Sequence, residues 1–427
     1  MKRVIRSSVF LIVFLVTIKP GFGQFSLLDS LLSKAHNQNP LIKGKALQFK
    51  AAEEMIRASG ALPDPMLSFA LNNVPTDSYD LDQEPMTGKM VAFSQSFPFP
   101  GKLGLKEEIS RMGSVSAKWE LENTRIGIDF RVKKLFFEIH FLDRAIEIVQ
   151  KNQNLLQNFI DIAQTKYAVG KGIQQDVLKA QVEYSLFFDK IVTLKQMRES
   201  KVAQLDALLN LELNNTFPEI NPLPEKLVDL DENSITQFAI KNNPVIKKIE
   251  SLYEQNKFRT RLAKKNYLPD FTLGIAYTQR EVLQTGMGGV DFVSGSVGLK
   301  IPLYFWKKQR NEYNSAKYRE KSSQFLLEDI LNQTKSQLND AFQQVKKQKE
   351  LLDLYKNSII PQATQSLNSA ISGYQTDKVD FLTLLNNLIV LFNYEKDYYQ
   401  VLTNYYIQIA RIEYLADTTL LSTNNEE

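Results

Sequence analysis

The hydrophobic positions of this chain follow two periods, a helical one along most of its length and an alternating one in four short stretches. The helical period predicts helices over residues 25–38, 41–62, 103–166, 176–210, 234–267 (interrupted at Pro244), 307–372 and from the turn at 373–378 to about 416. The alternating period predicts strands over residues 66–72, 89–97, 271–279 and 291–301. The chain is therefore expected to be all-α with a small β part.

Two of the expected helices are far longer than ordinary globular helices. Residues 103–166 contain no proline, and residues 307–372 contain only Pro361, which we expect the helix to tolerate. At about 1.5 Å per residue, the first would be roughly 95 Å long. Helices of this length indicate a coiled-coil or barrel-stave setting. The shorter helices before and after each long one would match its length if they stacked end to end.

The order of elements in the first half returns in the second. Asn39-Pro40 returns as Asn243-Pro244, about 204 residues later, and Leu62-Pro63-Asp64 returns as Leu268-Pro269-Asp270. We therefore expect an internal two-fold repeat. The predicted organisation is a signal peptide, a first repeat, a proline-containing linker, a second repeat and a polar tail, over residues 1–23, 24–213, 214–233, 234–416 and 417–427.

The first residues resemble a secretory signal. Lys2, Arg3 and Arg6 precede an apolar run from Val9 to Ile18, and Gly21-Phe22-Gly23 provides a small-residue cleavage region before Gln24. The apolar run is shorter than the roughly 20 residues that a spanning helix needs. We expect an exported mature protein without a transmembrane helix.

Charge and composition exclude several classes of function. The signal carries four basic residues and no acid, so its removal takes the formal charge from +4 to about zero and leaves no basic footprint for nucleic acid. The chain has no cysteine, which excludes disulfides, thiolate metal sites and a lipid-bearing N-terminal cysteine. Its two histidines, His36 and His140, have no ligand partner at a usable spacing. No catalytic pair or phosphate loop emerges, so we expect no enzyme, no cofactor and no metal site.

The strands suit two settings. In residues 271–278, Phe271, Leu273, Ile275 and Tyr277 alternate with small or polar residues, as in an outer-membrane barrel or in a half-buried soluble sheet. Four strands cannot close a barrel, and open edges are not tolerated in lipid. A barrel would need several chains, two giving about 8 strands or three giving about 12. The residues alone leave that choice open.

Four motifs together resemble the outer-membrane efflux proteins of the TolC type. Residues 58–67 are similar to the start of that family's first strand, and residues 93–102, with Phe97-Pro98-Phe99-Pro100, to its second-strand exit in the heavy-metal and copper branch. Tyr167-Ala168-Val169-Gly170 with residues 175–181 resembles the first periplasmic turn, and Tyr374 with residues 379–385 resembles the second.

The resemblance implies a homotrimer with a 12-stranded barrel in the outer membrane of a Gram-negative bacterium and a helical coiled-coil tunnel reaching into the periplasm. It also implies a periplasmic adaptor and an inner-membrane pump of the RND type as partners. Two departures concern the tips. Asp377 stands where the family commonly has a turn glycine, and Asn386-Asn387 replace its usual acid-containing sequence.

The candidate site residues lie at the two turns. Asp176 and Asp380 begin the returning helices, where an acid caps the helix or contributes to an acidic ring at the tunnel mouth. Tyr167, Tyr374 and Asp377 complete the expected gate, although tip packing alone would also explain the tyrosines. Gly170 and Gly172 are expected to need positive φ. With Lys171 and Lys378 they form the expected adaptor-docking turns. The tyrosine-rich last helix is interpreted as a packing seam.

The predicted function is a passive, gated duct across the periplasm and the outer membrane for substrates that a pump and an adaptor deliver. The alternative is a soluble periplasmic coiled-coil scaffold or adaptor, against which the alternating strands argue. Metal ions, small toxic molecules and secreted polypeptide are all conceivable cargoes, and residues 97–102 favour heavy metals.

Overall fold

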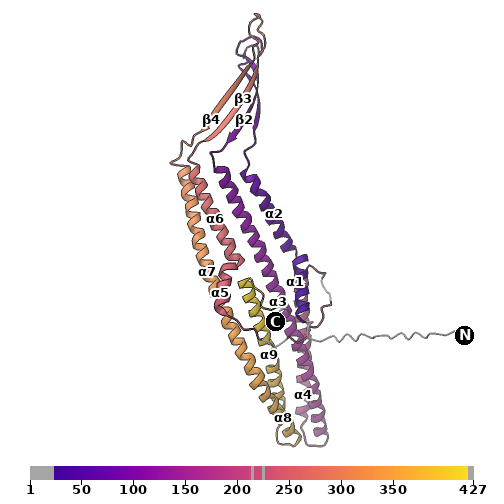
Figure 1. The fold of residues 1–427 in the computed structure, drawn as a ribbon. Helices are drawn as coiled ribbons and strands as arrows, with labels where there is room; N and C mark the ends of the chain where they lie inside the picture. The colour runs from indigo at the N-terminus through magenta and orange to yellow at the C-terminus, as the bar shows by residue number, and fades with distance from the viewer. Residues whose placement is uncertain (1–23, 213–215, 224–226, 422–427) are drawn as a thin grey trace, which may run out of the picture.

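The computed structural model describes residues 24–212, 216–223 and 227–421, so the predicted signal peptide lies outside the described residues. A long body of helices carries a narrow sheet at one end, and two turns that connect helices lie at the other end (Figure 1). The first half contains α1 (Gln24–Gln38), α2 (Pro40–Gly60), β1 (Met66–Asn72), β2 (Gly88–Phe97), α3 (Lys102–Ala168) and α4 (Gln174–Leu209). The second contains α5 (Glu232–Asn242), α6 (Pro244–Lys265), β3 (Asp270–Gln279), β4 (Phe292–Lys300), α7 (Gln309–Leu354), η1 (Tyr355–Ile359), α8 (Ile360–Gln375) and α9 (Phe381–Ala416).

Beneath the sheet, four helices lie side by side in the order α2, α3, α6, α7 (Figure 1). Toward the opposite end, α4 packs on α3 and α9 packs on α7 and α8, while α3 and α9 also contact each other. The pairs α2–α4 and α6–α9 thus accompany the long α3 and α7–α8, as the helix lengths predict.

The two repeated asparagines join these shorter helices. The side-chain oxygen of Asn39 accepts hydrogen bonds from the N–H groups of Leu41 and Ile42, which caps α2, while its amide donates to the carbonyl of Leu208 at the end of α4 (2.8 Å). Asn243 caps α6 in the same way and donates to the carbonyl of Leu415 near the end of α9 (2.8 Å). One buried side chain therefore satisfies orphan groups on two stacked helix ends.

The second long helix is not continuous, contrary to expectation. A π-helical turn, Tyr355–Ile359, separates α7 from α8, and the N–H of Ile360 donates to the carbonyl of Tyr355 five residues earlier. Pro361 follows at once. Proline has no N–H and its ring clashes with the carbonyl four residues before it, so the helix widens locally to relieve the clash.

The four strands form one antiparallel sheet in the order β1-β2-β3-β4. The register aligns Phe69, Val91, Tyr277 and Val293 in one row, and Ser68, Ala92, Ala276 and Ser294 in an adjacent row on the other face. We call these the apolar face and the polar face. The apolar face is solvent-exposed in the single chain, with Phe69 74% and Val293 70% exposed. The strand predictions are confirmed to within two residues at each end.

The main core lies at the middle of the helical body, where α1, α3, α7 and α9 meet. Tyr405 and Tyr406 are fully buried there, and Tyr406 stacks on Phe137 of α3 with ring centroids 5.0 Å apart. The interpretation of the last helix as a packing seam is confirmed. No helix within residues 24–212, 216–223 and 227–421 has the length and apolar character required to cross a membrane.

Candidate functional site

The two interhelical turns, which connect α3 to α4 and α8 to α9, lie together at the end of the body opposite the sheet (Figure 1). We call them the tip turns. They share one hydrogen-bond pattern. The N–H of Gly170 donates to Tyr167 and that of Lys171 to Lys166, while the N–H of Asp377 donates to Tyr374 and that of Lys378 to Gly373. Corresponding residues are therefore 207 positions apart, and both turns close by the same backbone geometry.

The backbone angles explain the residue types at one turn position and correct the expectation at another. Gly170 has a φ of 75°, and Asp377, at the corresponding position of the second turn, has a φ of 61°. Aspartate therefore adopts the left-handed conformation that glycine adopts in the first turn. Gly172 does not have positive φ, which was predicted wrongly. A Cβ on Gly172 would lie 3.1 Å from the Cβ of Lys166, so glycine serves there to let the turn approach α3 closely.

Lys166, in the last turn of α3, binds the second turn. Its ammonium group donates hydrogen bonds to the carbonyl of Tyr374 and to the carboxylate of Asp377, and lies 4.4 Å from the centre of the Tyr374 ring. The hydrogen bond from Lys166 lowers the pKa of the Asp377 carboxyl. We call Lys166, Tyr374 and Asp377 the tip latch. The candidate residues drawn from the sequence did not include Lys166, although a basic residue in the last turn of a helix is a recognisable partner for nearby carbonyls.

The two predicted acids lie close enough to influence each other. Burial, and then the negative charge of Asp380, raises the pKa of Asp176. Burial, followed by the charges of Asp176 and Asp377, raises the pKa of Tyr374 to about 12. The Tyr374 hydroxyl is buried and has no hydrogen-bond partner among the described residues. The tip of one chain therefore concentrates negative charge around a buried phenol.

Asp176 and Asp380 do not occupy equivalent positions, although each begins a returning helix. Asp380 is the N-cap of α9, and its carboxylate accepts a hydrogen bond from the N–H of Thr383 (2.7 Å). Asp176 lies in the first turn of α4, whose N-cap is Ile173, without a side-chain cap. Capping explains Asp380 directly. Asp176 has only the favourable interaction with the helix dipole.

The remaining predicted residues differ in exposure. Tyr374 is 5% exposed and packs against Phe381 with ring centroids 5.5 Å apart, whereas its counterpart Tyr167 is 49% exposed. Lys171 and Lys378 are both exposed on their turns. The structure thus brings together Asp176, Asp380, Tyr374 and Asp377, and leaves Tyr167 on the surface of the chain.

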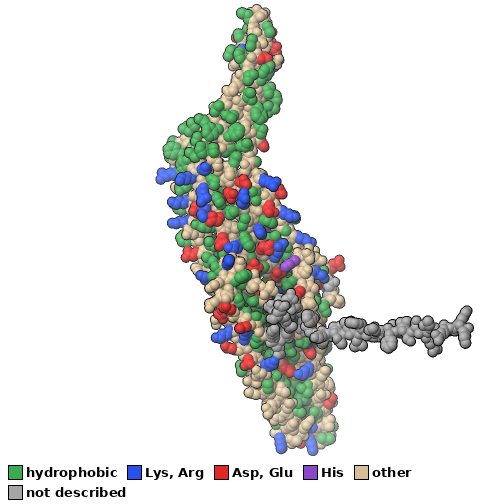
Figure 2. Space-filling view, in the orientation of Figure 1, with side chains coloured by type: hydrophobic (Ala, Val, Ile, Leu, Met, Phe, Trp, Pro, Cys, Tyr) green, Lys and Arg blue, Asp and Glu red, His purple; other side chains and the backbone are tan. Residues whose placement is uncertain are grey.

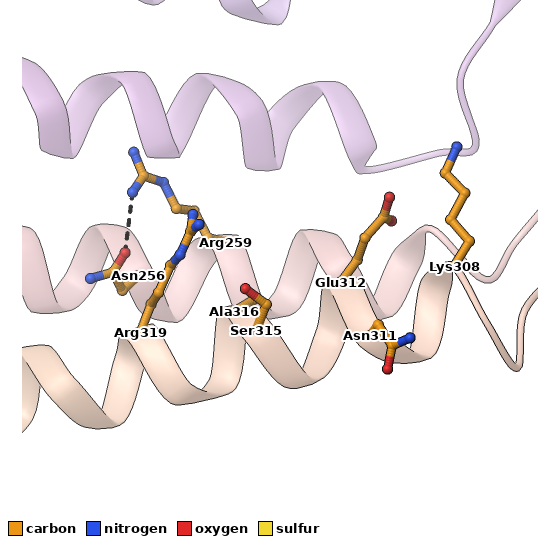
Figure 3. A pocket seen from close by; sticks show the side chains of 8 residues that line it. All are labelled: Asn256, Arg259, Lys308, Asn311, Glu312, Ser315, Ala316 and Arg319. Carbon is orange, nitrogen blue, oxygen red and sulfur yellow. Dashed lines mark hydrogen bonds between the residues drawn. The ribbon is translucent and has the colours of Figure 1, made fainter.

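A basic recess lies between α6 and α7 (Figure 3). Its volume is about 440 Å³, and Arg259, Lys308 and Arg319 line it together with Glu312. Figure 3 shows the side chains of Arg259, from α6, and Arg319, from α7, with Arg259 hydrogen-bonded to Asn256. We refer to it as the α6–α7 recess. Its cationic lining is unsuited to holding a bare metal cation.

The histidines do not form a metal centre. Within the described parts of the chain, no group of three or more His, Asp or Glu side chains is arranged to hold a metal ion. His36 Nε2 lies 2.6 Å from Asp129 Oδ1 and links α1 to α3, while His140 is fully buried and its pKa is lowered to about 4 by burial. Both histidines therefore contribute to the packing of the helices rather than to a metal site.

Comparison with known sequences identifies the family. The sequence pattern of the family described as "Outer membrane efflux protein" matches residues 31–211 and 235–416. The chain is 20% identical over 380 residues to the cobalt-zinc-cadmium resistance protein CzcC of Cupriavidus metallidurans, covering 89% of this chain and 87% of that protein. It is 22% identical over 305 residues to the toxin and drug export protein A of Aggregatibacter actinomycetemcomitans, covering 67% and 66%.

Solved structures share the fold. CusC superposes with a TM-score of 0.78 at 14% identity, covering 92% of both chains. VceC of Vibrio cholerae has a TM-score of 0.78 at 16% identity, covering 93% of this chain and 97% of that one. These likenesses confirm the resemblance stated from the motifs and do not favour the periplasmic scaffold. The chain therefore belongs to the outer membrane efflux protein family, whose members are channels of the outer membrane.

Proposed function

We propose that three copies of this chain form a gated duct, with a 12-stranded barrel in the outer membrane and a helical tunnel in the periplasm. The main support for this proposal is the structure of the sheet. Two of its four strands, β1 and β4, are edge strands that are each unpaired on one side, and its two faces are of opposite character. Open edges are not tolerated in lipid, and the exposed apolar face needs a partner such as acyl chains. Pairing β4 of one copy with β1 of the next removes every edge, and three copies follow from the family resemblance.

The tip turns are the proposed gate. The tip latch holds the α8–α9 turn against the end of α3 in one chain, whereas the nearby charges of Asp176 and Asp380 repel each other. In a three-fold assembly, Asp176 and Asp380 would recur around the axis as an acidic ring that favours cations. Opening requires the returning helices α4 and α9 to move away from the axis, which separates the latch residues.

The proposed partners are a periplasmic adaptor and an inner-membrane pump of the RND type. The exposed turns around Gly170, Lys171, Gly172 and Lys378 are the proposed docking surface for the adaptor, because they project at the free end of the body. Tyr167 is exposed beside them and is the proposed aromatic contact of either the adaptor or a neighbouring copy.

Heavy-metal ions are the proposed cargo. The similarity to CzcC, a cobalt-zinc-cadmium resistance protein, supports this choice, and residues 97–102 agree with it. The toxin and drug export protein is a relative of comparable identity and supports organic cargo instead. Selectivity is expected to lie mainly in the pump, because a wide aqueous duct offers few selective contacts.

The test is single-channel conductance of the purified protein in a planar lipid bilayer, with the mass of the oligomer measured in parallel. A trimer with small, cation-selective and flickering currents is expected. A monomeric species that never inserts into the bilayer would refute the proposed assembly and return the periplasmic scaffold to first place.

A further inference from the structure

A groove with both basic and apolar walls lies where the helices meet the sheet. It runs between the start of α3 and the end of α6, and its volume is about 820 Å³. We call it the α3–α6 groove. Its apolar part is formed by Leu105, Tyr267 and Leu268, and its basic part by Arg261, Lys264 and Lys265. A groove of this composition fits a molecule with an anionic head and an apolar tail.

The groove opens on the side of the apolar face. Phe99, just after β2, stacks on Phe271, which lies in the same cross-strand row as Phe97 and Leu299 (ring centroids 6.4 Å apart). Lys265 of the groove lies 5.8 Å from the centre of the Phe99 ring and donates to the carbonyl of Pro100 (2.9 Å). The apolar face and the groove therefore form one continuous surface.

The α6–α7 recess lies on the opposite side of α6. Arg259 and Arg261 are two residues apart, which places them about 160° from each other around the helix. Arg261 lines the α3–α6 groove and Arg259 lines the recess. Since the apolar face must be the outer face of the proposed barrel, the groove faces outward and the recess faces the duct.

The charges in the groove are available to an anion. Arg261 and Lys264 are exposed, and neither forms an ion pair with an acid among the described residues. The one acid of the lining, Glu108, already pairs with Arg111 (3.4 Å). Gly104 contributes open space, because a Cβ built on it would have no atom within 4 Å. The groove therefore combines positive charge with room.

The level of the groove agrees with a membrane boundary. After β4, the consecutive aromatic residues Tyr304, Phe305 and Trp306 are 70%, 51% and 58% exposed. Tyrosine and tryptophan favour the depth of lipid headgroups. Figure 2 shows hydrophobic side chains gathered where the sheet meets the helices, with Lys and Arg directly below them.

The groove would also remain uncovered in the proposed assembly. It lies between α3 and α6, the two inner helices of the row α2-α3-α6-α7, and below β2 and β3, the two inner strands. Pairing through the edge strands would bring neighbouring copies to α2 and α7 and leave the groove facing the membrane.

We propose that the α3–α6 groove binds a glycerophospholipid of the membrane leaflet that faces the helices. Arg261 and Lys264 contact its phosphate, and Leu105, Tyr267 and Leu268 contact the upper part of its acyl chains. This inference rests on the proposed insertion of the sheet into the outer membrane. Each groove of the assembly would hold one such lipid and fix the depth of the barrel without a covalent lipid anchor.

The test is native mass spectrometry of the detergent-purified assembly titrated with dioleoylphosphatidylglycerol. Wild type is expected to retain the lipid, and the double variant Arg261→Gln, Lys264→Gln to bind it about 30-fold more weakly, since each basic residue near a lipid surface contributes roughly 1 kcal/mol. Gly104→Leu fills the open space and is expected to weaken binding without removing charge. The matched control is Lys346→Gln, Lys347→Gln, which removes the same charge from exposed positions of α7 and should bind like wild type.

Two further probes distinguish the lipid from other sources of the same chemistry. Dioleoylglycerol, which has the same chains without phosphate, should bind much more weakly, and inorganic phosphate should not displace the phospholipid. Equal binding of wild type and the double variant, or of the two lipids, would overturn the proposal, as would displacement by phosphate. Single-channel conductance distinguishes failure of the lipid site from failure of the proposed channel function. Normal channels with no retained lipid refute only the lipid site, whereas absence of channels refutes the proposed function.

Discussion

Lys166 at the end of α3 forms an ion pair with Asp377 in the turn before α9, which joins residues 211 positions apart in the sequence. The same lysine binds the carbonyl of Tyr374. The pair connects the last turn of one long helix to the turn that follows the other. In the proposed opening, this contact separates as the returning helices move outward, so it is the most direct target for testing the proposed gate.

Lys166→Gln and Asp377→Asn should each raise the resting conductance about two- to fivefold, the range expected when one exposed ion pair biases a closed state. The measurement is single-channel recording in a planar bilayer without adaptor. Lys378→Gln, in the same turn, is the matched control, since Lys378 takes no part in the latch. Unchanged conductance in both latch variants would show that the pair packs the tip without holding it closed.

Two substitutions at Asp380 separate helix capping from a role of the charge. Asparagine caps a helix as well as aspartate, so Asp380→Asn should keep the thermal stability, whereas Asp380→Ala should cost about 0.5–2 kcal/mol. If an acidic ring selects cations, both variants lose cation selectivity. If capping is the whole role of Asp380, both variants keep their cation selectivity, and only the alanine variant loses thermal stability.

The raised pKa of Asp176 predicts a pH dependence of the tip. With a folded pKa above 3.8, the charged carboxylate destabilises the closed tip at neutral pH, and the tip becomes more stable as the pH falls through the raised pKa toward 3.8. Asp377 has a lowered pKa, so the latch keeps its full contribution above 3.8 and loses it only at lower pH. Resting conductance should therefore decrease between pH 7 and about pH 4.

Asp176→Asn should remove most of that decrease and reduce conductance at pH 7. An Asp176→Asn channel that retains the wild-type pH profile would assign the effect to other groups. The control is Asp189→Asn, an acid of α4 outside the first turn.

The two faces of the sheet should respond oppositely to charge. Val297 lies on the apolar face of β4 and is 73% exposed in the single chain, while Ser294 lies on the polar face. A lysine facing the bilayer midplane costs about 2–4 kcal/mol. Val297→Lys should therefore reduce the fraction of protein incorporated into lipid vesicles, and Ser294→Lys should incorporate normally and shift selectivity toward anions. Equal incorporation of both variants would argue against a lipid-facing apolar surface.

The contacts of Asn39 and Asn243 that join stacked helix ends should contribute strongly to stability. Asn243→Ala removes the cap of α6 and leaves the buried carbonyl of Leu415 without its partner, which together should cost about 2–4 kcal/mol. Asn242→Ala, whose side chain bonds only within its own helix, should change stability by less than about 0.5 kcal/mol. Thermal unfolding followed by circular dichroism compares them. Similar melting temperatures for the two variants would show that the joint is not a stabilising contact.

Local patterns in the sequence were sufficient for the elements and for the identity of the turns. A helical period cannot be satisfied by a strand, and an alternating period cannot be satisfied by a helix, so the order of helices and strands follows from short windows of residues. The tip turns were recognisable from the glycines of the first turn and from the resemblance of both turns to motifs of the family. The π-helical turn at Tyr355–Ile359 was not, because the clash at Pro361 can be relieved by kinking, ending or widening a helix.

The chain by itself therefore determined its elements, their repeated order, the contrast between the faces of its sheet, and the family to which it belongs. Packing in three dimensions determined which distant groups meet: Lys166 with Asp377, Asn243 with Leu415, and the basic residues of α6 with the apolar face of the sheet. The physical reason is the range of each effect. Backbone sterics and periodicity act within a few residues, whereas ion pairs, buried hydrogen bonds and grooves depend on how whole helices are placed beside one another.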